Sequence, residues 1–159
     1  MKIRIGFGFD VHQLKEGNEL WLGGIKLLHT KGAVGHSDAD VLIHAICDAL
    51  LGAAGLRDIG FYFPNTSAEF KNIDSKLLLA RVMELLKIEN YNVGNIDCTL
   101  ILEEPKINPH IELMKQTLAK VMNIPLTDIG IKATTNEQMG YVGREEGVCA
   151  YAVALIEKI

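Results

Sequence analysis

The sequence predicts a single α/β (α+β) domain over residues 1–159, with one mostly four-stranded mixed sheet, an N-terminal hairpin and helices packed on one face. Strand-like segments alternate with helical segments of crossover length, which favours one sheet covered by helices. No repeat, linker or low-complexity stretch divides the chain. A length of 159 residues is also ordinary for one domain with one core.

The first third of the chain is predicted to begin as β structure. Residues 3–12 are rich in Ile, Phe and Val, and residues 19–28 place apolar runs on both sides of Gly23-Gly24. Apolar runs that flank a glycine turn are typical of a β-hairpin. We therefore expect a strand over 3–12 and a hairpin over 19–28.

A helix of about four turns is predicted to follow, because apolar residues recur at a helical period from Val41 to Ala53. Ser37 can cap its N-terminus, with Asp40 at the third helical position. The remaining predicted elements are a loop over 58–66, a helix from Asp74 or Ser75 to about Leu86, a strand over Asn95–Glu103, a helix from Pro109 to about Met122, and strands over 128–135 and 147–157.

Composition excludes some classes of function. The net charge of −4 argues against a general nucleic-acid or anionic-membrane binder, because the whole-molecule field would attract neither polyanion. The three cysteines are widely spaced in apolar surroundings, which predicts reduced core thiols. No secretory signal precedes Lys2, and no apolar run reaches the roughly 18 residues that span a bilayer. We therefore expect a cytoplasmic protein that binds neither nucleic acid nor membrane.

Asp10 and His12 are the first residues to suggest a metal site. If residues 3–12 form a strand, these two side chains point to the same face, roughly 6.6 Å apart along it. His44 on the predicted helix can add a third ligand, which completes the pattern of a catalytic zinc site with one open position. Each residue alone has a simpler explanation, as a strand-end carboxylate or a partly buried histidine. The metal hypothesis therefore depends on the set.

Polar residues around the same helix supply further candidates. Asp40 and Asp48 lie four residues before and after His44, so either carboxylate could hold its imidazole ring. His36 and Ser37 precede the helix, where free backbone N–H groups favour a phosphate. Ser37 can also act as a cap without any ligand.

Two later segments could hold the rest of a phosphorylated ligand. Residues 132–137 follow an apolar strand and combine a lysine, two threonines and a glutamate. The single carboxylate of Glu137 is adequate for magnesium or manganese if the ligand is a diphosphate. Residues 105–108 form a Pro-Lys-Ile-Asn loop whose backbone could grip a flat ring. In isolation, the first segment is a polar turn and the second is a connector at a helix start.

Several ordered segments together resemble the family of 2-C-methyl-D-erythritol 2,4-cyclodiphosphate synthases. They are GFGFDVH, HSDADVLIHAICDALLGAAGLRDIG, FPNT, EEPKINPHI and IKATTNEQMGYVGREEG, followed by the closing apolar strand. The resemblance covers almost the full chain. Ordered blocks at family-like spacing are far more specific than one Asp-x-His pattern.

The resemblance implies a reaction and an assembly. Family members convert 4-diphosphocytidyl-2-C-methyl-D-erythritol 2-phosphate to 2-C-methyl-D-erythritol 2,4-cyclodiphosphate and CMP, in non-mevalonate isoprenoid precursor biosynthesis. The substrate's own 2-phosphate attacks, so the enzyme is a phosphorus-oxygen lyase that acts by metal-assisted intramolecular phosphoryl transfer. Members are homotrimers built around their sheets, with active sites between subunits. The implied partners are therefore a small cytidine diphosphate derivative and further copies of the chain.

The resemblance also implies a role for each candidate residue. Zn²⁺ is expected at Asp10, His12 and His44, and Mg²⁺ or Mn²⁺ is expected at Glu137 as a second divalent cation. The catalytic residues expected are His36, Thr135 and Glu137. The substrate-binding residues expected are His36 and Ser37 at the methylerythritol phosphate, Asp58 and Gly60 at the erythritol hydroxyls, Thr134 and Thr135 at the phosphate chain, Pro105, Lys106, Ile107, Asn108 and Ala133 around cytidine, and Arg144 at a trimer-axis cavity.

The chain departs from the family pattern at several positions. Asn65 and Ser67 stand where many members have aspartates, which puts loop contacts to the substrate in doubt. Glu103 and Glu104 add negative charge beside the expected nucleotide loop. If these carboxylates point inward, we expect weaker CMP binding.

Two other functions fit the same residues. Two histidines and one carboxylate also define the facial triad of non-haem iron oxygenases, although the usual all-β barrel of those enzymes fits poorly with the predicted helices. A trimeric, metal-dependent ligand-binding protein would carry the same site without turnover. The residues by themselves leave both alternatives open.

Overall fold

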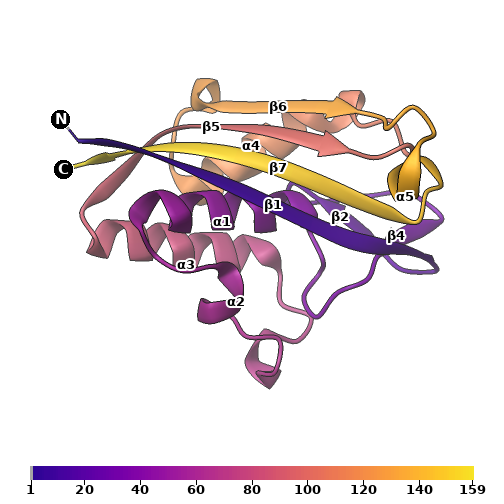
Figure 1. Cartoon of the computed structure of the whole chain (residues 1–159), viewed down its shortest axis with the longest axis horizontal. Helices are drawn as coiled ribbons and strands as arrows, with labels where there is room; N and C mark the ends of the chain where they lie inside the picture. The colour runs from indigo at the N-terminus through magenta and orange to yellow at the C-terminus, as the bar shows by residue number, and fades with distance from the viewer. Residues whose placement is uncertain (1) are drawn as a thin grey trace.

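The strands form a five-stranded mixed sheet and a separate two-stranded hairpin in the computed structural model, which describes residues 2–159 (Figure 1). The sheet has the order β4-β1-β7-β5-β6, and the hairpin pairs β2 with β3. The strands are β1 (Ile3–Glu16), β2 (Leu20–Leu22), β3 (Ile25–Leu27), β4 (Lys31–Ala33), β5 (Tyr91–Ile101), β6 (Ile129–Thr134) and β7 (Gly147–Lys158). The helices are α1 (Val41–Ala54), α2 (Ile59–Tyr62), α3 (Ser75–Ile88), α4 (Ile111–Met122) and α5 (Gly140–Gly143), with 3-10 turns at Ala68–Phe70, Asn108–His110 and Leu126–Asp128.

The sheet is antiparallel except at one edge. β1 and β5 each pair antiparallel with β7, whereas β6 pairs parallel with β5. A parallel pair needs a crossover connection, and α4 provides it between β5 and β6. The carboxyl ends of β5 and β6 therefore lie at the same edge of the sheet, and the loops that follow them are neighbours.

The long helices cover one face of the sheet (Figure 1). α1 packs on β1 and β7, α3 packs on α1, and α4 packs on β6 and α3. Leu42, Ile46 and Leu50 of α1 are completely buried between these layers. The core therefore lies between the sheet and the helices.

Two glycines of β1 allow α1 to lie directly on the sheet. A Cβ built on Gly6 would lie 1.9 Å from the carbonyl oxygen of Ala49, and one built on Gly8 would lie 1.9 Å from that of Ala45. Any larger residue at either position would push the helix away. The predicted metal ligands of β1 are the next residues along the same face, because alternate strand residues point to one side. The close contact therefore brings the first turn of α1 next to them.

The opposite face of the sheet is apolar and exposed. Ile5, Phe7 and Phe9 of β1 expose 69%, 62% and 41% of their surface. Tyr151 of β7 lies beside Phe9, with ring centroids 5.0 Å apart. An antiparallel sheet normally turns polar residues toward water, so a contiguous apolar face indicates a surface for protein contact.

The predicted hairpin, the long helices and the two C-terminal strands are confirmed. β4, a short fifth strand, extends the mostly four-stranded sheet that the sequence predicts. It pairs with the end of β1, which continues to Glu16 rather than ending at His12. The three residues of β4 carry no strand pattern of their own, so only this pairing identifies the strand. The predicted 58–66 loop contains the one-turn helix α2.

The predicted cap of α1 is wrong, because the cap is Asp40 rather than Ser37. The Asp40 carboxylate accepts a hydrogen bond from the N–H of Ile43, and it also accepts bonds from the N–H groups of Gly23 and Gly24 at 3.0 and 2.6 Å. This carboxylate is completely buried. Asp40 therefore ties the β2–β3 hairpin to α1, a role that the helical pattern alone does not indicate.

The predicted free thiols are confirmed, since Cys47, Cys98 and Cys149 are all buried and free. Among residues 2–159, no helix is both long enough and apolar enough to cross a bilayer.

Candidate active site

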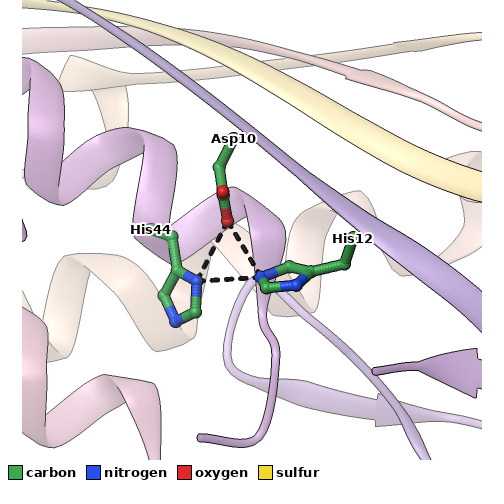
Figure 2. A group of neighbouring side chains, drawn as sticks. All are labelled: Asp10, His12 and His44. Carbon is green, nitrogen blue, oxygen red and sulfur yellow. Dashed lines mark hydrogen bonds and ion pairs between the residues drawn. The ribbon is translucent and has the colours of Figure 1, made fainter. Parts of the chain in front are cut away.

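Asp10, His12 and His44 meet where β1 passes the first turn of α1 (Figure 2). Asp10 Oδ2 lies 3.0 Å from His12 Nε2 and 3.0 Å from His44 Nδ1, and the two nitrogens lie 3.1 Å apart. The three atoms form a nearly equilateral triangle. The structure therefore brings together the three ligands predicted from the sequence.

The triangle fits a small divalent cation. In a tetrahedral site with ligands about 2.0–2.1 Å from the ion, ligand atoms lie roughly 3.3 Å from one another, close to the spacing found here. Two imidazoles and one carboxylate also suit a catalytic zinc ion that keeps one open position. The donor set and its spacing therefore fit the expected metal.

The outer nitrogens of both histidines are held by the protein. His12 Nδ1 lies 3.0 Å from the carbonyl oxygen of Val34, so it must donate its hydrogen there. His44 Nε2 lies 3.0 Å from Ser75 Oγ, whose own hydrogen is donated to the Asp38 carboxylate. In its neutral form, each imidazole therefore turns a hydrogen-free nitrogen toward the triangle, as metal binding requires.

Asp38 and Ser75 are functional residues that the sequence reasoning missed. Ser75 is completely buried at the start of α3, and its N–H donates to Asp38 Oδ2 at 2.8 Å. Asp38 and Ser75 are far apart in the sequence, and Ser75 stood out there only as a possible helix cap. No local pattern links either residue to His44.

The carboxylates predicted to hold His44 have other partners. Asp40 caps α1 and binds the hairpin, while Asp48 Oδ1 accepts a hydrogen bond from the N–H of Ile59 at 2.7 Å. Spacing of four residues places side chains on one helix face, but it does not decide what they bond. The serine–aspartate pair, rather than Asp40 or Asp48, holds the imidazole.

The three groups also alter one another's protonation. Burial alone would raise the pKa of Asp10, but hydrogen bonds with His12 and His44 hold this pKa well below its usual value. Burial alone would lower the pKa of His12, but the hydrogen bond and charge of Asp10 raise it. Without a metal, the site therefore favours a proton on His12 beside an ionised Asp10, and a cation must displace that proton.

A cavity of about 360 Å³ opens beside the triangle. Among the predicted substrate residues, His36, Ser37 and Gly60 line it together with the three predicted metal ligands, and so does Asn65. Ser37 Oγ accepts a hydrogen bond from the N–H of Ala39 and lies 3.2 Å from His44 Nε2. Because Ser37 is the acceptor in both contacts, its hydroxyl hydrogen is left for a ligand.

Other residues predicted to bind the substrate near the triangle make contacts within the protein itself. His36 and Ser37 belong to the loop before α1, whose N-terminus is capped by buried Asp40, so a phosphate contact at these two residues stays a prediction. His36 Nε2 lies 3.0 Å from the carbonyl oxygen of Ser67. Asp58 caps α2 by accepting a hydrogen bond from the N–H of Phe61 at 2.9 Å.

A second cavity, of about 190 Å³, lies between the loops that follow β5 and β6. It is lined by the residues predicted around cytidine and the phosphate chain, Pro105, Lys106, Ile107, Asn108, Ala133, Thr134 and Thr135, and by Leu102 and Glu103. The two sets of predicted binding residues therefore lie in separate cavities of one chain.

This second cavity is not lined by three charged residues that the sequence suggested for ligand binding, Glu137, Lys132 and Arg144. Glu137 Oε1 is 3.5 Å from Thr135 Oγ1, next to the cavity wall. Lys132 Nζ lies 2.5 Å from both carboxylate oxygens of Asp97, so the lysine considered for phosphate binding is paired on the sheet surface. Arg144 forms a two-pronged ion pair with Glu146, at 3.0 Å for each contact.

Comparison with known proteins places this site in a family. The profile of the YgbB family matches residues 3–157. The chain belongs to the YgbB family. A YgbB relative from Bacteroides thetaiotaomicron, 2-C-methyl-D-erythritol 2,4-cyclodiphosphate synthase, is 64% identical over 158 residues, with 99% of each chain covered. The resemblance drawn from the sequence segments is therefore confirmed.

Solved structures agree with this assignment. A CDP-bound 2C-methyl-D-erythritol-2,4-cyclodiphosphate synthase matches with a TM-score of 0.90 and 36% identity, over 97% of this chain and 100% of that chain. The bifunctional IspDF from Campylobacter jejuni matches with a TM-score of 0.95 and 36% identity over 99% of this chain, which spans 43% of the length of that protein. The predicted α+β domain with helices on one face of a mixed sheet is the fold of the YgbB family.

Proposed function

We propose that this chain is a cyclodiphosphate synthase of non-mevalonate isoprenoid precursor biosynthesis, a phosphorus-oxygen lyase. It converts 4-diphosphocytidyl-2-C-methyl-D-erythritol 2-phosphate to 2-C-methyl-D-erythritol 2,4-cyclodiphosphate and CMP. The observation that carries the proposal is the triangle of Asp10, His12 and His44, open to a cavity in a chain whose relatives are synthases of this name. The same comparisons favour this function over an iron oxygenase or a ligand-binding protein.

The reaction must bring together two phosphate groups that repel each other. A pair of like unit charges roughly 4 Å apart costs about 1 kcal/mol in water and about 4 kcal/mol at an effective dielectric constant of 20. Zn²⁺ at Asp10, His12 and His44, with Mg²⁺ or Mn²⁺ at Glu137, would supply compensating charge and Lewis acidity. The substrate's own phosphate is the nucleophile, so the protein needs none.

The cavity beside the triangle suits the methylerythritol phosphate. The Ser37 hydroxyl can donate to a phosphate oxygen, and His36 is held at the cavity by its contact with Ser67. Gly60 lines the cavity, whereas Asp58 lines a separate pocket with Asp48 and Arg57, so its contact with an erythritol hydroxyl stays a prediction. Such contacts hold the substrate folded, and well-oriented intramolecular reactions reach effective molarities of about 10⁵ to 10⁸ M.

The cavity between the β5 and β6 loops suits cytidine and its phosphates. Ile107 is buried and provides an apolar surface for the base, while Lys106 is exposed and can reach a phosphate. The hydroxyls of Thr134 and Thr135 stand at the end of β6 and donate to the carbonyl oxygen of Thr135 and to Glu137. By rotating away from these acceptors, they can donate to the phosphate chain. The CDP-bound relative supports a nucleotide ligand of this class.

We propose that the protein assembles as a homotrimer. Two observations support this assembly: the exposed apolar sheet face, which includes Phe7 and Phe9, and the separation of the two cavities in one chain. Neighbouring subunits would bury the apolar face and could bring the nucleotide cavity of one against the metal cavity of the next. Arg144 is then proposed at the trimer axis. A cytoplasmic location stays a prediction.

Phosphorus NMR tests the proposed reaction. Purified protein, Zn²⁺, Mg²⁺ and the diphosphocytidyl substrate should yield equal amounts of CMP and the cyclic diphosphate. Binding of the substrate without release of CMP would indicate the ligand-binding alternative. Oxygen-dependent turnover with bound iron would indicate the oxygenase.

A further inference from the structure

The loops after β5 and β6 are joined by one carboxylate. Glu103 lies two residues beyond β5, and its Oε1 accepts hydrogen bonds from the N–H groups of Asn136 and Gln138 at 2.9 and 3.2 Å. Glu103 also lines the cavity between these loops. The parallel pairing of β5 with β6 makes this contact possible, because it places both carboxyl ends at the same edge.

The loop held by Glu103 has an unusual backbone. Glu137 and Gln138 have φ angles of 52° and 61°, so two successive residues with side chains adopt the left-handed conformation. This conformation crowds the Cβ of an L-residue and persists only where surrounding contacts impose it. Asn136 Nδ2 donates to the carbonyl oxygen of Met139 at 2.7 Å, which adds a second restraint. The strained turn lies directly after Thr135, at the cavity wall.

A third contact holds the turn from the side of α5. A Cβ built on Gly143 would lie 2.1 Å from the carbonyl carbon of Gln138, so the backbone of α5 packs tightly on the turn. The hydrogen bonds that the carboxylate accepts from backbone N–H groups are charge-assisted, which makes them the strongest hydrogen bonds among these restraints. Glu103 therefore restrains the backbone of the turn at two of its N–H groups.

We infer that Glu103 is a positioning residue for the phosphate chain of a nucleoside diphosphate. It fixes the turn that carries Thr135 and Glu137, so that both side chains face the ligand without rearrangement. The inference rests on the proposed function and names a residue beyond the binding set predicted from the sequence. From the sequence, an inward-pointing Glu103 is expected to weaken CMP binding. Because its carboxylate instead accepts hydrogen bonds from backbone N–H groups, it supports nucleotide binding.

Glu104 provides a matched control. It is the adjacent glutamate, it is exposed, and its carboxylate pairs with Lys106 Nζ at 3.5 Å rather than with the turn. Glu103→Ala and Glu104→Ala therefore remove the same charge from the same loop. Glu103→Gln keeps a carbonyl oxygen that can accept both N–H groups, so it tests the geometry apart from the charge.

The experiment compares the affinity of the full-length variants for CDP and for CMP, by calorimetry with Mn²⁺ present. Glu103→Ala should weaken CDP binding by about tenfold and CMP binding by less than about threefold, because the second phosphate depends most on the turn. Glu103→Gln should stay within about threefold of the wild type for both nucleotides. Amide exchange at Asn136 and Gln138 should accelerate in Glu103→Ala but not in Glu104→Ala.

Two results would contradict the inference: CDP affinity in Glu103→Ala equal to that of Glu104→Ala, or equal losses for CDP and CMP. The second pattern would mean that the carboxylate merely supports the fold of the cavity. A wild-type protein that binds neither nucleotide would instead contradict the proposed function. The two failures are therefore distinguishable.

Discussion

Gly8 of β1 lies directly against Ala45 of α1, so closely that a Cβ on the glycine would approach the alanine carbonyl oxygen to 1.9 Å. His44 is the neighbour of Ala45, and Asp10 follows Gly8 on the same face of the strand. The separation of helix and strand at this contact therefore sets the distance between an imidazole ligand and a carboxylate ligand. Helix packing and the geometry of the proposed metal site therefore depend on the same pair of small residues.

Gly8→Ala should weaken both the fold and the metal site. The added methyl group must displace α1, which should cost about 1–3 kcal/mol of unfolding free energy and reduce zinc affinity by at least about tenfold. Gly52→Ala is the control, because a Cβ there meets nothing within 4 Å. That variant should be more stable than the wild type by up to about 1 kcal/mol. Denaturant unfolding measures the change in stability, and a competitive titration measures the change in zinc affinity. If Gly8→Ala and Gly52→Ala had the same stability and the same zinc affinity, the contact at Gly8 would not set the geometry of the metal site.

Ser75→Ala should reduce zinc affinity by about 10- to 100-fold, because it removes the nearer of the two hydroxyl acceptors that orient His44. The control is Ser67→Ala, since Ser67 Oγ only accepts the N–H of Glu69 in an exposed loop and its contact with His36 uses the backbone. Zinc titration against a chelator of known affinity separates the variants. Wild-type affinity in Ser75→Ala would show that His44 needs no such partner.

The stability of the metal-free protein should depend on pH through Asp10 and His12. The pKa of Asp10 is lowered from 3.8 by folding, so its contribution is present above this value and is lost as pH falls through the lower, folded pKa. The pKa of His12 is raised from 6.5, so its contribution is present below this value and is lost as pH rises through the higher, folded pKa. The Asp10–His12 pair should therefore stabilise the metal-free protein most between pH 3.8 and pH 6.5, the pKa values of the two groups in the unfolded chain.

Zinc should reverse the alkaline part of this dependence, because the metal needs a deprotonated His12 and binds more tightly as pH rises. Thermal unfolding at a series of pH values, with and without zinc, measures the effect. His12→Gln should remove the alkaline loss in the metal-free protein. A metal-free Tm that rises steadily between pH 6.5 and 9 would contradict the assignment.

Phe7→Glu should dissociate the proposed trimer. Phe7 exposes 62% of its surface at the centre of the apolar sheet face, where a buried, unpaired carboxylate would be very unfavourable in an assembly. Leu77→Glu on α3 is the control, because Leu77 is also exposed, at 56%, but lies on the helical side of the molecule. Sedimentation equilibrium should show a smaller species only for Phe7→Glu. A trimer that survives this change would place the interface elsewhere.

Local patterns predicted the elements whose stability comes from their own periodicity. The apolar repeat from Val41 to Ala53 identified α1, and turn residues around Gly23-Gly24 identified the hairpin. The start of α1, the strand β4 and the helix α2 were harder to predict, since each depends on a partner distant in sequence. Asp40 is the clearest case, because its carboxylate caps α1 and binds the hairpin at once.

The sequence by itself determined the candidate ligands and the family. Two residues at i and i+2 of a strand must share a face, so Asp10 and His12 were paired before any fold was known. Only the tertiary structure decided which side chains hold His44, why α1 comes close enough for His44 to join Asp10 and His12, and that the proposed nucleotide cavity lies apart from the proposed metal site. These features depend on contacts between distant segments, and such contacts follow from packing in three dimensions rather than from any local pattern.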